Sequence, residues 1–179
     1  EHDIHTPWAN HLADGQVAVG RGAGGKVAVG SAVAGETLEV LRRQDAFGDG
    51  GRIEWLCGSA ERFAPFYMLV GSGGYTTGAG NLAPHVTLAM HAALSAGEYQ
   101  EALWLQSVLL PIEDYRARSG DSFNVSMLKY AMSLVGSDFG PPRAPGRQLS
   151  VDERSEIDAL MAPILEIESS MRAELIGVG

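Results

Sequence analysis

The sequence holds a single cysteine, Cys57, so no disulfide can form within the chain. It has no apolar run near the ~20 residues that a membrane-spanning helix needs. The first ten residues are polar and lack the apolar core of a signal peptide. Together these absences predict a cytoplasmic protein with no segment inside a membrane.

Positive charge is also scarce. The 179 residues include 13 Lys and Arg against 22 Asp and Glu, which gives a net charge of −9. Nucleic acids and anionic membrane surfaces both attract clustered basic residues, so the acidic balance argues against either as a partner. Apolar residues make up 45% of the chain and charged residues 20%, a composition typical of a globular protein with a core. The length suits one domain or slightly more.

Short strands and helices alternate over residues 1–82. Apolar runs predict four strands, at 16–20, 26–30, 52–57 and 75–77. Helical spacing of apolar residues predicts two helices, at 36–43 and 61–70. Glycines at 71, 73 and 74 end the second of these helices. Strands that alternate with helices are typical of a parallel α/β unit.

Residues 83–179 have a helical pattern throughout. Apolar spacing predicts helices at 84–96, 98–110 and 124–135, and a last helix that opens at residue 150. Ser150-Val-Asp-Glu153 has the form of a capping box at the start of that helix. Between the last two helices, residues 137–147 hold three prolines and two glycines, which predicts a loop. The chain therefore divides into an α/β segment, 1–82, and a helical region, 83–179.

The patterns of metal sites and of serine hydrolases are absent. The five histidines are dispersed, and His85 and His91 lie six residues apart rather than at the i, i+4 spacing of a helical metal site. No Gly-x-Ser-x-Gly elbow occurs. We therefore expect no metal and no cofactor.

One glycine-rich segment fits two phosphate-binding patterns. Gly20-Arg-Gly-Ala-Gly-Gly-Lys26 matches both G-x-x-x-x-G-K and G-x-G-x-x-G. Position 27 is Val, however, where the phosphate loop needs Ser or Thr for magnesium. Both patterns also need a helix to begin at the last glycine, whereas the residues that follow predict a strand. Nucleotide binding is one hypothesis, and a glycine-rich connection between two strands is the other.

Lysine is rare in this chain. Only Lys26 and Lys129 occur, against eleven arginines. A lysine buried at the edge of an apolar strand loses its charge by desolvation, and the neutral amine can form a Schiff base with a carbonyl. A solvated surface lysine is the simpler interpretation of Lys26 taken alone.

Several segments, in order, resemble the dihydrodipicolinate synthase / N-acetylneuraminate lyase family. They begin with Lys26-Val-Ala-Val-Gly-Ser31 and continue with the glycine- and threonine-rich segments of the next two strands. Trp55–Phe66 resembles the seventh strand with its helix, and Gly73–Pro84 resembles the eighth strand with its loop. Ala96–Ala102 resembles the link between the first appended helices, and Phe123–Lys129 resembles the start of the third. The resemblance covers most of residues 26–172.

The resemblance implies a partial (β/α)8 TIM-type barrel, strands six to eight, followed by a C-terminal helical region. It also implies that Lys26 is the nucleophile that forms a Schiff base with a 2-oxo acid such as pyruvate. Gly58, Thr76 and Thr77 would lie at the catalytic rim, where the strands of such barrels end. Glu61 would reach a substrate hydroxyl.

Two motifs of the family do not occur in this sequence. Only 25 residues precede Lys26, and they contain neither the Gly-Thr-Thr-Gly-Glu turn nor the proton-relaying Tyr. We therefore expect the chain to be the C-terminal part of such an enzyme. One hypothesis is a Schiff-base lyase or synthase, incomplete as an isolated chain. The other is a non-catalytic subunit or remnant that binds a partner chain, either as a homo-oligomer or with a longer homologue.

Overall fold

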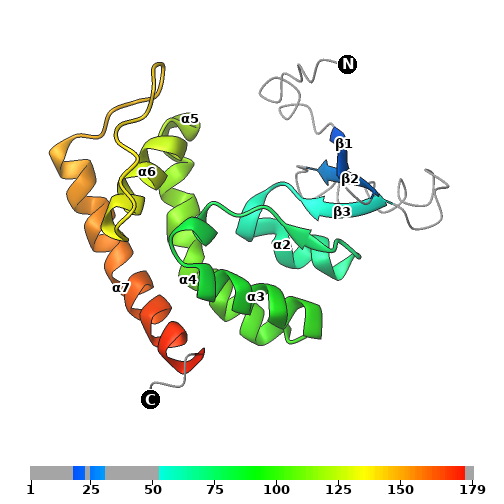
Figure 1. Ribbon diagram of the computed structural model, residues 1–179. Helices are drawn as coiled ribbons and strands as arrows, with labels where there is room; N and C mark the ends of the chain where they lie inside the picture. Colours follow the sequence, from blue (N-terminus) through cyan, green and yellow to red (C-terminus); the bar gives the residue numbers. More distant parts are fainter. Residues whose placement is uncertain (1–17, 23–24, 31–52, 176–179) are drawn as a thin grey trace. The chain divides into compact units, whose positions relative to one another are not determined.

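The computed structural model describes residues 18–22, 25–30 and 53–175, and the side chains of residues 55–174. The chain forms two compact units, which divide between Thr76 and Thr77 (Figure 1). In the described residues, the first unit carries a four-stranded sheet and the helix α2, and the second unit is built from helices. The boundary predicted from the sequence, after residue 82, lies a few residues later in the chain than this division, just before the helix that begins at Pro84. The helix expected at 36–43 lies outside the described residues.

The sheet of the first unit has the order β1-β2-β3-β4. Its strands are β1 (Ala18–Gly22), β2 (Gly25–Gly30), β3 (Ile53–Cys57) and β4 (Gly74–Tyr75). The pairs β2–β3 and β3–β4 are parallel, as the alternation of strands and helices predicts. Between β3 and β4 lies α2 (Ala60–Leu69), which is the helix expected at 61–70.

The first strand departs from the parallel pattern expected for a barrel segment. β1 pairs with β2 in the antiparallel sense, with Gly22 opposite Gly25. A parallel pair needs a crossover connection of a dozen or more residues, whereas a connection this short can form only a hairpin. Residues 20–22 and 25–26 therefore lie on paired antiparallel strands, and β2 occupies the position where a phosphate-binding motif needs the start of a helix. This geometry argues against the nucleotide hypothesis.

The second unit follows the helices expected from the sequence. A short 3-10 turn, η2 (Ala79–Asn81), leads into α3 (Pro84–Ala96), α4 (Tyr99–Arg116), α5 (Arg118–Asp121), α6 (Asn124–Leu134) and α7 (Val151–Leu175). α4 runs beyond the expected end at Leu110, through Pro111 to Arg116. This extension buries Ile112 and Tyr115, so packing outweighs the cost of a proline inside the helix.

The core of the second unit forms where α3, α4, α6 and α7 meet. Gly97, at φ +77°, ends α3 in the left-handed conformation and lets α4 turn back against it. The fully buried apolar side chains come from all four helices: Val86, Met90, Leu105, Leu109, Ile112, Met127, Ile157 and Met161. Burying each of them contributes roughly 1.5–3 kcal/mol before the entropy cost is counted.

A carboxylate from α7 completes the start of α3. α3 begins with Pro84, and no side chain of its own N-terminal segment caps it. Glu168 accepts hydrogen bonds from the backbone N–H groups of His85 at 3.1 Å and Val86 at 3.0 Å, and its Oε1 lies 2.5 Å from His85 Nδ1. The buried carboxylate thus satisfies two helix-terminal donors and faces the positive end of the helix dipole.

Other polar contacts hold the first turn of α7. Ser150 and Glu153 form the expected capping box, with reciprocal bonds of 2.8 and 3.2 Å. This box and the Arg147 guanidinium lower the pKa of Glu153. The Tyr115 hydroxyl donates to the Glu153 carbonyl at 3.1 Å and joins α4 to α7.

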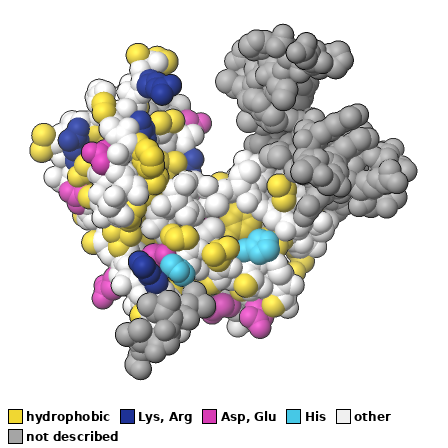
Figure 2. Space-filling model, viewed as in Figure 1, with side chains coloured by type: hydrophobic (Ala, Val, Ile, Leu, Met, Phe, Trp, Pro, Cys, Tyr) yellow, Lys and Arg dark blue, Asp and Glu magenta, His cyan; other side chains and the backbone are white. Residues whose placement is uncertain are grey.

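The surface agrees with the acidic composition. On the face seen in Figure 2, basic and acidic side chains of the described helices are interspersed rather than gathered into a basic patch. Within the described residues, no helix is long and apolar enough to cross a membrane.

Glu168→Ala is expected to lower the free energy of unfolding by about 2 kcal/mol, because two N–H groups at the start of α3 lose their acceptor. Urea denaturation measures the change. Glu166→Ala is the matched control, because Glu166 lies on the same helix but is exposed. That variant should change stability by less than about 0.5 kcal/mol. Equal losses in the two variants would contradict a capping role for Glu168.

Candidate functional site

The candidate site lies where β3 and β4 end. In the parallel register, Leu56 is opposite Gly74 and Cys57 is opposite Tyr75, so both strands end at the same edge of the sheet. Gly58 follows β3 and Thr76 follows β4. Functional side chains in parallel α/β barrels gather at this edge, because the loops that follow the strands meet there.

Backbone hydrogen bonds bring Gly58 and Thr76 together. The Thr76 N–H donates to the carbonyl of Cys57, the residue before Gly58, at 2.8 Å. The Thr76 hydroxyl lies 3.4 Å from the same carbonyl. Thr76 is exposed and Gly58 is partly exposed, so both can be reached by a ligand.

Thr77 has a different local role. Its hydroxyl accepts a hydrogen bond from the Gly80 N–H at 2.7 Å, which shapes the turn leading into η2. Thr77 is exposed and follows Thr76 directly. Thr77 is therefore adjacent in sequence to Thr76 at the sheet edge, but its hydroxyl oxygen is hydrogen-bonded within the turn.

Glu61 is fully buried in the first turn of α2. A carboxylate at this position is favoured by the positive end of the helix dipole. Burial raises the pKa of the Tyr75 phenol, and the negative charge of Glu61 raises it further. Glu61 has no exposed surface in this structure, and its contact with a substrate hydroxyl stays a prediction.

The turn between β3 and α2 is conformationally unusual. Ala60 has φ +56°, in the left-handed region that non-glycine residues rarely adopt. Backbone strain of this kind costs about 1–3 kcal/mol and tends to occur at functional sites. Cys57 precedes the turn and is fully buried in a cluster with Tyr67, so it contributes to packing.

The register places Lys26 at the other end of the sheet. In the β2–β3 pair, Lys26 is opposite Ile53, the first residue of β3, whereas Gly30 is opposite Cys57, the last. The four residue steps from Lys26 to Gly30 correspond to about 13 Å of strand. The structure thus brings Gly58, Glu61 and Thr76 into one region, and it does not bring the backbone of Lys26 to the same edge.

Lys129, the other lysine, belongs to the helical unit. It lies on α6, and its Nζ donates to the Pro141 carbonyl at 3.0 Å. None of the residues described at the carboxyl ends of β2, β3 and β4 is a lysine. Within the described part of the chain, no group of three or more His, Cys, Asp or Glu side chains could hold a metal ion.

Ser72 is a positioning residue that sequence reasoning missed. Its buried hydroxyl lies 2.8 Å from the Trp55 carbonyl and 2.9 Å from the Gly74 carbonyl, and so it ties the start of β4 to β3. In the sequence Ser72 stands among glycines, and these glycines were interpreted only as the end of a helix. The available sign of its role was a polar residue between glycines, just before a short strand.

Comparison with known proteins identifies the family. The family model described as the dihydrodipicolinate synthetase family matches residues 26–164. The chain belongs to this family. Members have a TIM-barrel fold, and the described part of this chain is mostly helical, with four short strands.

The similar curated proteins are dehydratases. The chain is 32% identical over 122 residues to a probable 5-dehydro-4-deoxyglucarate dehydratase of Ralstonia nicotianae, covering 66% of this chain and 39% of that protein. It is 30% identical over 115 residues to the 5-dehydro-4-deoxyglucarate dehydratase of Pseudomonas putida, covering 63% of this chain and 38% of the relative. The chain thus spans about two fifths of the length of these relatives.

Solved structures show the same relationship. Dihydrodipicolinate synthase from Oceanobacillus iheyensis superposes with a TM-score of 0.66 at 30% identity, over 71% of this chain and 42% of that one. N-acetylneuraminate lyase from Proteus mirabilis has a TM-score of 0.60 at 21% identity, over 75% of this chain and 43% of that one, and supports the fold alone. Membership in a family of lyases and dehydratases follows, as the resemblance in the sequence implied.

Ser72→Ala is expected to lower the free energy of unfolding by about 1 kcal/mol, because a buried hydrogen bond between β4 and β3 is lost. Chemical denaturation checks the value. In the control, Ser95→Ala, the exposed hydroxyl bonds only to the His91 carbonyl of its own helix. That change should be neutral or slightly stabilising, since Ala is the better helix former. A neutral Ser72→Ala would remove Ser72 from the support of the site.

Proposed function

We propose that this chain is a 2-oxo-acid-binding component of a lyase or dehydratase of the dihydrodipicolinate synthetase family, and that it does not itself supply the Schiff-base lysine. In this proposal β2, β3 and β4 correspond to barrel strands six to eight. The ligand binds at the carboxyl edge of β3 and β4, beside Gly58 and Thr76. The observation that carries the proposal is the register of β2, in which Lys26 is paired with the first residue of β3.

The chemistry of a Schiff base explains why this position matters. The amine must attack the carbonyl carbon of the 2-oxo acid while other groups hold the carboxylate, so all of them must meet within a few ångströms. The backbone of Lys26 lies about 13 Å along the strand from the edge where Gly58 and Thr76 lie. Lys129 is on a helix of the other unit. The non-catalytic alternative is therefore better supported than a Schiff base on Lys26.

The proposed ligand class comes from the relatives and from the residues at the edge. The similar proteins are named as dehydratases of 5-dehydro-4-deoxyglucarate, which is an acid. The exposed Thr76 hydroxyl and the backbone beside Gly58 offer polar groups to a small carboxylate such as pyruvate. A complete catalytic site then needs groups from a partner, either a second copy of the chain or a longer homologue.

Borohydride trapping with pyruvate tests the nucleophile. Borohydride reduces an imine to a stable amine, so any Schiff base becomes a covalent adduct detected by intact mass and peptide mapping. We expect no adduct on Lys26 or Lys129 of the wild-type chain. A full-length dihydrodipicolinate synthase treated in parallel is the positive control. An adduct on Lys26 that disappears in Lys26→Arg would overturn the proposal and support a Schiff-base lyase.

Pyruvate binding to Thr76 variants tests the location. Thr76→Val should weaken pyruvate binding by about tenfold, because it removes the hydroxyl and keeps the side-chain shape. Thr76→Ser keeps the hydroxyl and should bind within about twofold of the wild type. Isothermal titration calorimetry gives the dissociation constants. Equal binding by both variants, or no pyruvate binding by the wild type, would count against a ligand site at this edge.

A further inference from the structure

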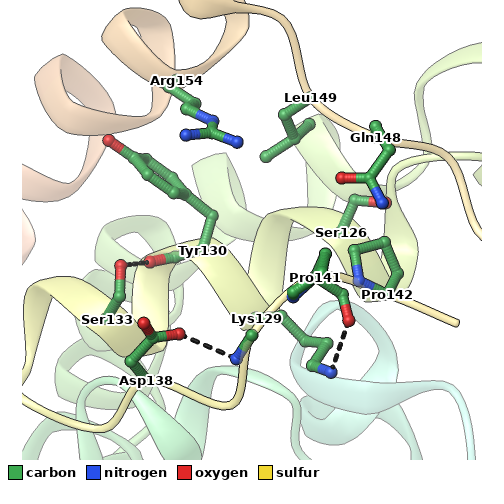
Figure 3. Close-up of a pocket in the computed structure, with 11 residues that line it drawn as sticks. Ser126, Lys129, Tyr130, Ser133, Asp138, Pro141, Pro142, Gln148, Leu149 and Arg154 are labelled. Atoms are coloured by element: carbon green, nitrogen blue, oxygen red, sulfur yellow. Dashed lines mark hydrogen bonds between the residues drawn. The ribbon is translucent and has the colours of Figure 1, made fainter.

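A pocket lies within the helical unit. It is formed by α6, the loop that follows it and the first turn of α7 (Figure 3). Its volume is about 360 Å³. That volume is in the range of pockets that hold small organic molecules. All of its lining residues come from residues 126–154, so the pocket belongs to the second unit alone.

Two cationic side chains line this pocket in an otherwise acidic chain. Lys129 enters from α6 and Arg154 from the first turn of α7 (Figure 3). The Lys129 ammonium has three donors, and the Pro141 carbonyl accepts from one of them at 3.0 Å. The Arg154 guanidinium lies over the Tyr130 ring, 5.5 Å from its centroid, a contact that holds the cation at the pocket wall.

The acidic groups near the pocket have other contacts. Asp138 is the one carboxylate among the lining residues, and its Oδ1 accepts the Gly140 N–H at 2.8 Å within its own loop. Asp158 Oδ1 accepts a hydrogen bond from the Tyr130 hydroxyl at 2.9 Å. Glu153, next to Arg154 in the chain, pairs with Arg147 and with the backbone of Ser150. These contacts leave Lys129 and Arg154 as the groups best placed to attract an anion.

The remaining wall has both polar and apolar parts. Gln148 brings a side-chain amide, while Leu149, Pro141 and Pro142 bring hydrocarbon surface. The hydroxyls of Ser126 and Ser133 donate to the carbonyls of Arg147 and Tyr130, so their protons are used within the protein. Charge-assisted donors beside apolar surface suit an organic anion better than an inorganic one.

We propose that this pocket binds a small organic carboxylate, held by Lys129 and Arg154, at a site separate from the ligand edge of the sheet. The two cations bind the carboxylate oxygens, and the hydrocarbon part of the ligand contacts Leu149 and the two prolines. Binding weakens as salt is added, because Arg154 is exposed and Lys129 is partly exposed, so both cations are screened by ions.

Succinate is the probe, and its binding is monitored by amide NMR on the ¹⁵N-labelled full chain. We expect saturable shifts concentrated in residues 126–154. Lys129→Gln, which keeps a hydrogen-bond donor, and Arg154→Gln should each weaken succinate binding by about tenfold. Arg143→Gln is the matched control, because this exposed arginine lies on the same loop and does not line the pocket. It should bind within about twofold of the wild type.

Four results would overturn the proposal. The first is the absence of saturable shifts up to about 10 mM succinate. The second is unchanged binding in both Lys129→Gln and Arg154→Gln. The third is an equal loss in Arg143→Gln, which would indicate general attraction to positive charge. The fourth is inorganic phosphate binding as tightly as succinate, since the apolar wall would then contribute nothing.

Discussion

In a parallel sheet, each residue's position along its strand decides which neighbouring strands it can act with. The register that sets Gly30 beside Cys57 and Cys57 beside Tyr75 brings the ends of three strands to one edge. It equally keeps the first residues of β2 away from that edge. Gly58, Thr76 and the buried Glu61 of α2 thus lie in one region. These residues can form hydrogen bonds, but none of them is an amine nucleophile.

The helical unit depends on contacts between residues far apart in the chain. Its core is apolar, but its polar contacts also cross between helices. Tyr115 joins α4 to α7, and the Arg147 guanidinium lies 4.2 Å from the centre of the Phe123 ring. These contacts hold the first turn of α7 and the preceding loop close to α6. The wall of the pocket between them is therefore shaped by the same contacts that stabilise the unit.

The sequence predicted elements whose signal is local. The helices at α2, α3 and α6, the strand at β3 and the Ser150 capping box depend on spacing and end residues, and all were expected. The family was also identified from short ordered segments. Features that depend on distant partners were not accessible. The antiparallel pairing of β1, the extension of α4 past Pro111 and the role of Ser72 are decided by what lies opposite in space. The resemblance implied that Lys26 is the nucleophile, whereas the parallel register of β2 against β3 puts this residue opposite the first residue of β3.

The carboxylate that completes α3 has a consequence for the order in which the protein can assemble. His85 and Glu168 are 83 residues apart, and a ribosome makes the helix long before it makes the cap. Until α7 has emerged and docked, the first amides of α3 have only water as an acceptor, and this end of the helix frays. The start of α3 follows directly on the turn after Thr76 and Thr77. The first turn of α3 therefore reaches its final form only when the last helix is in place.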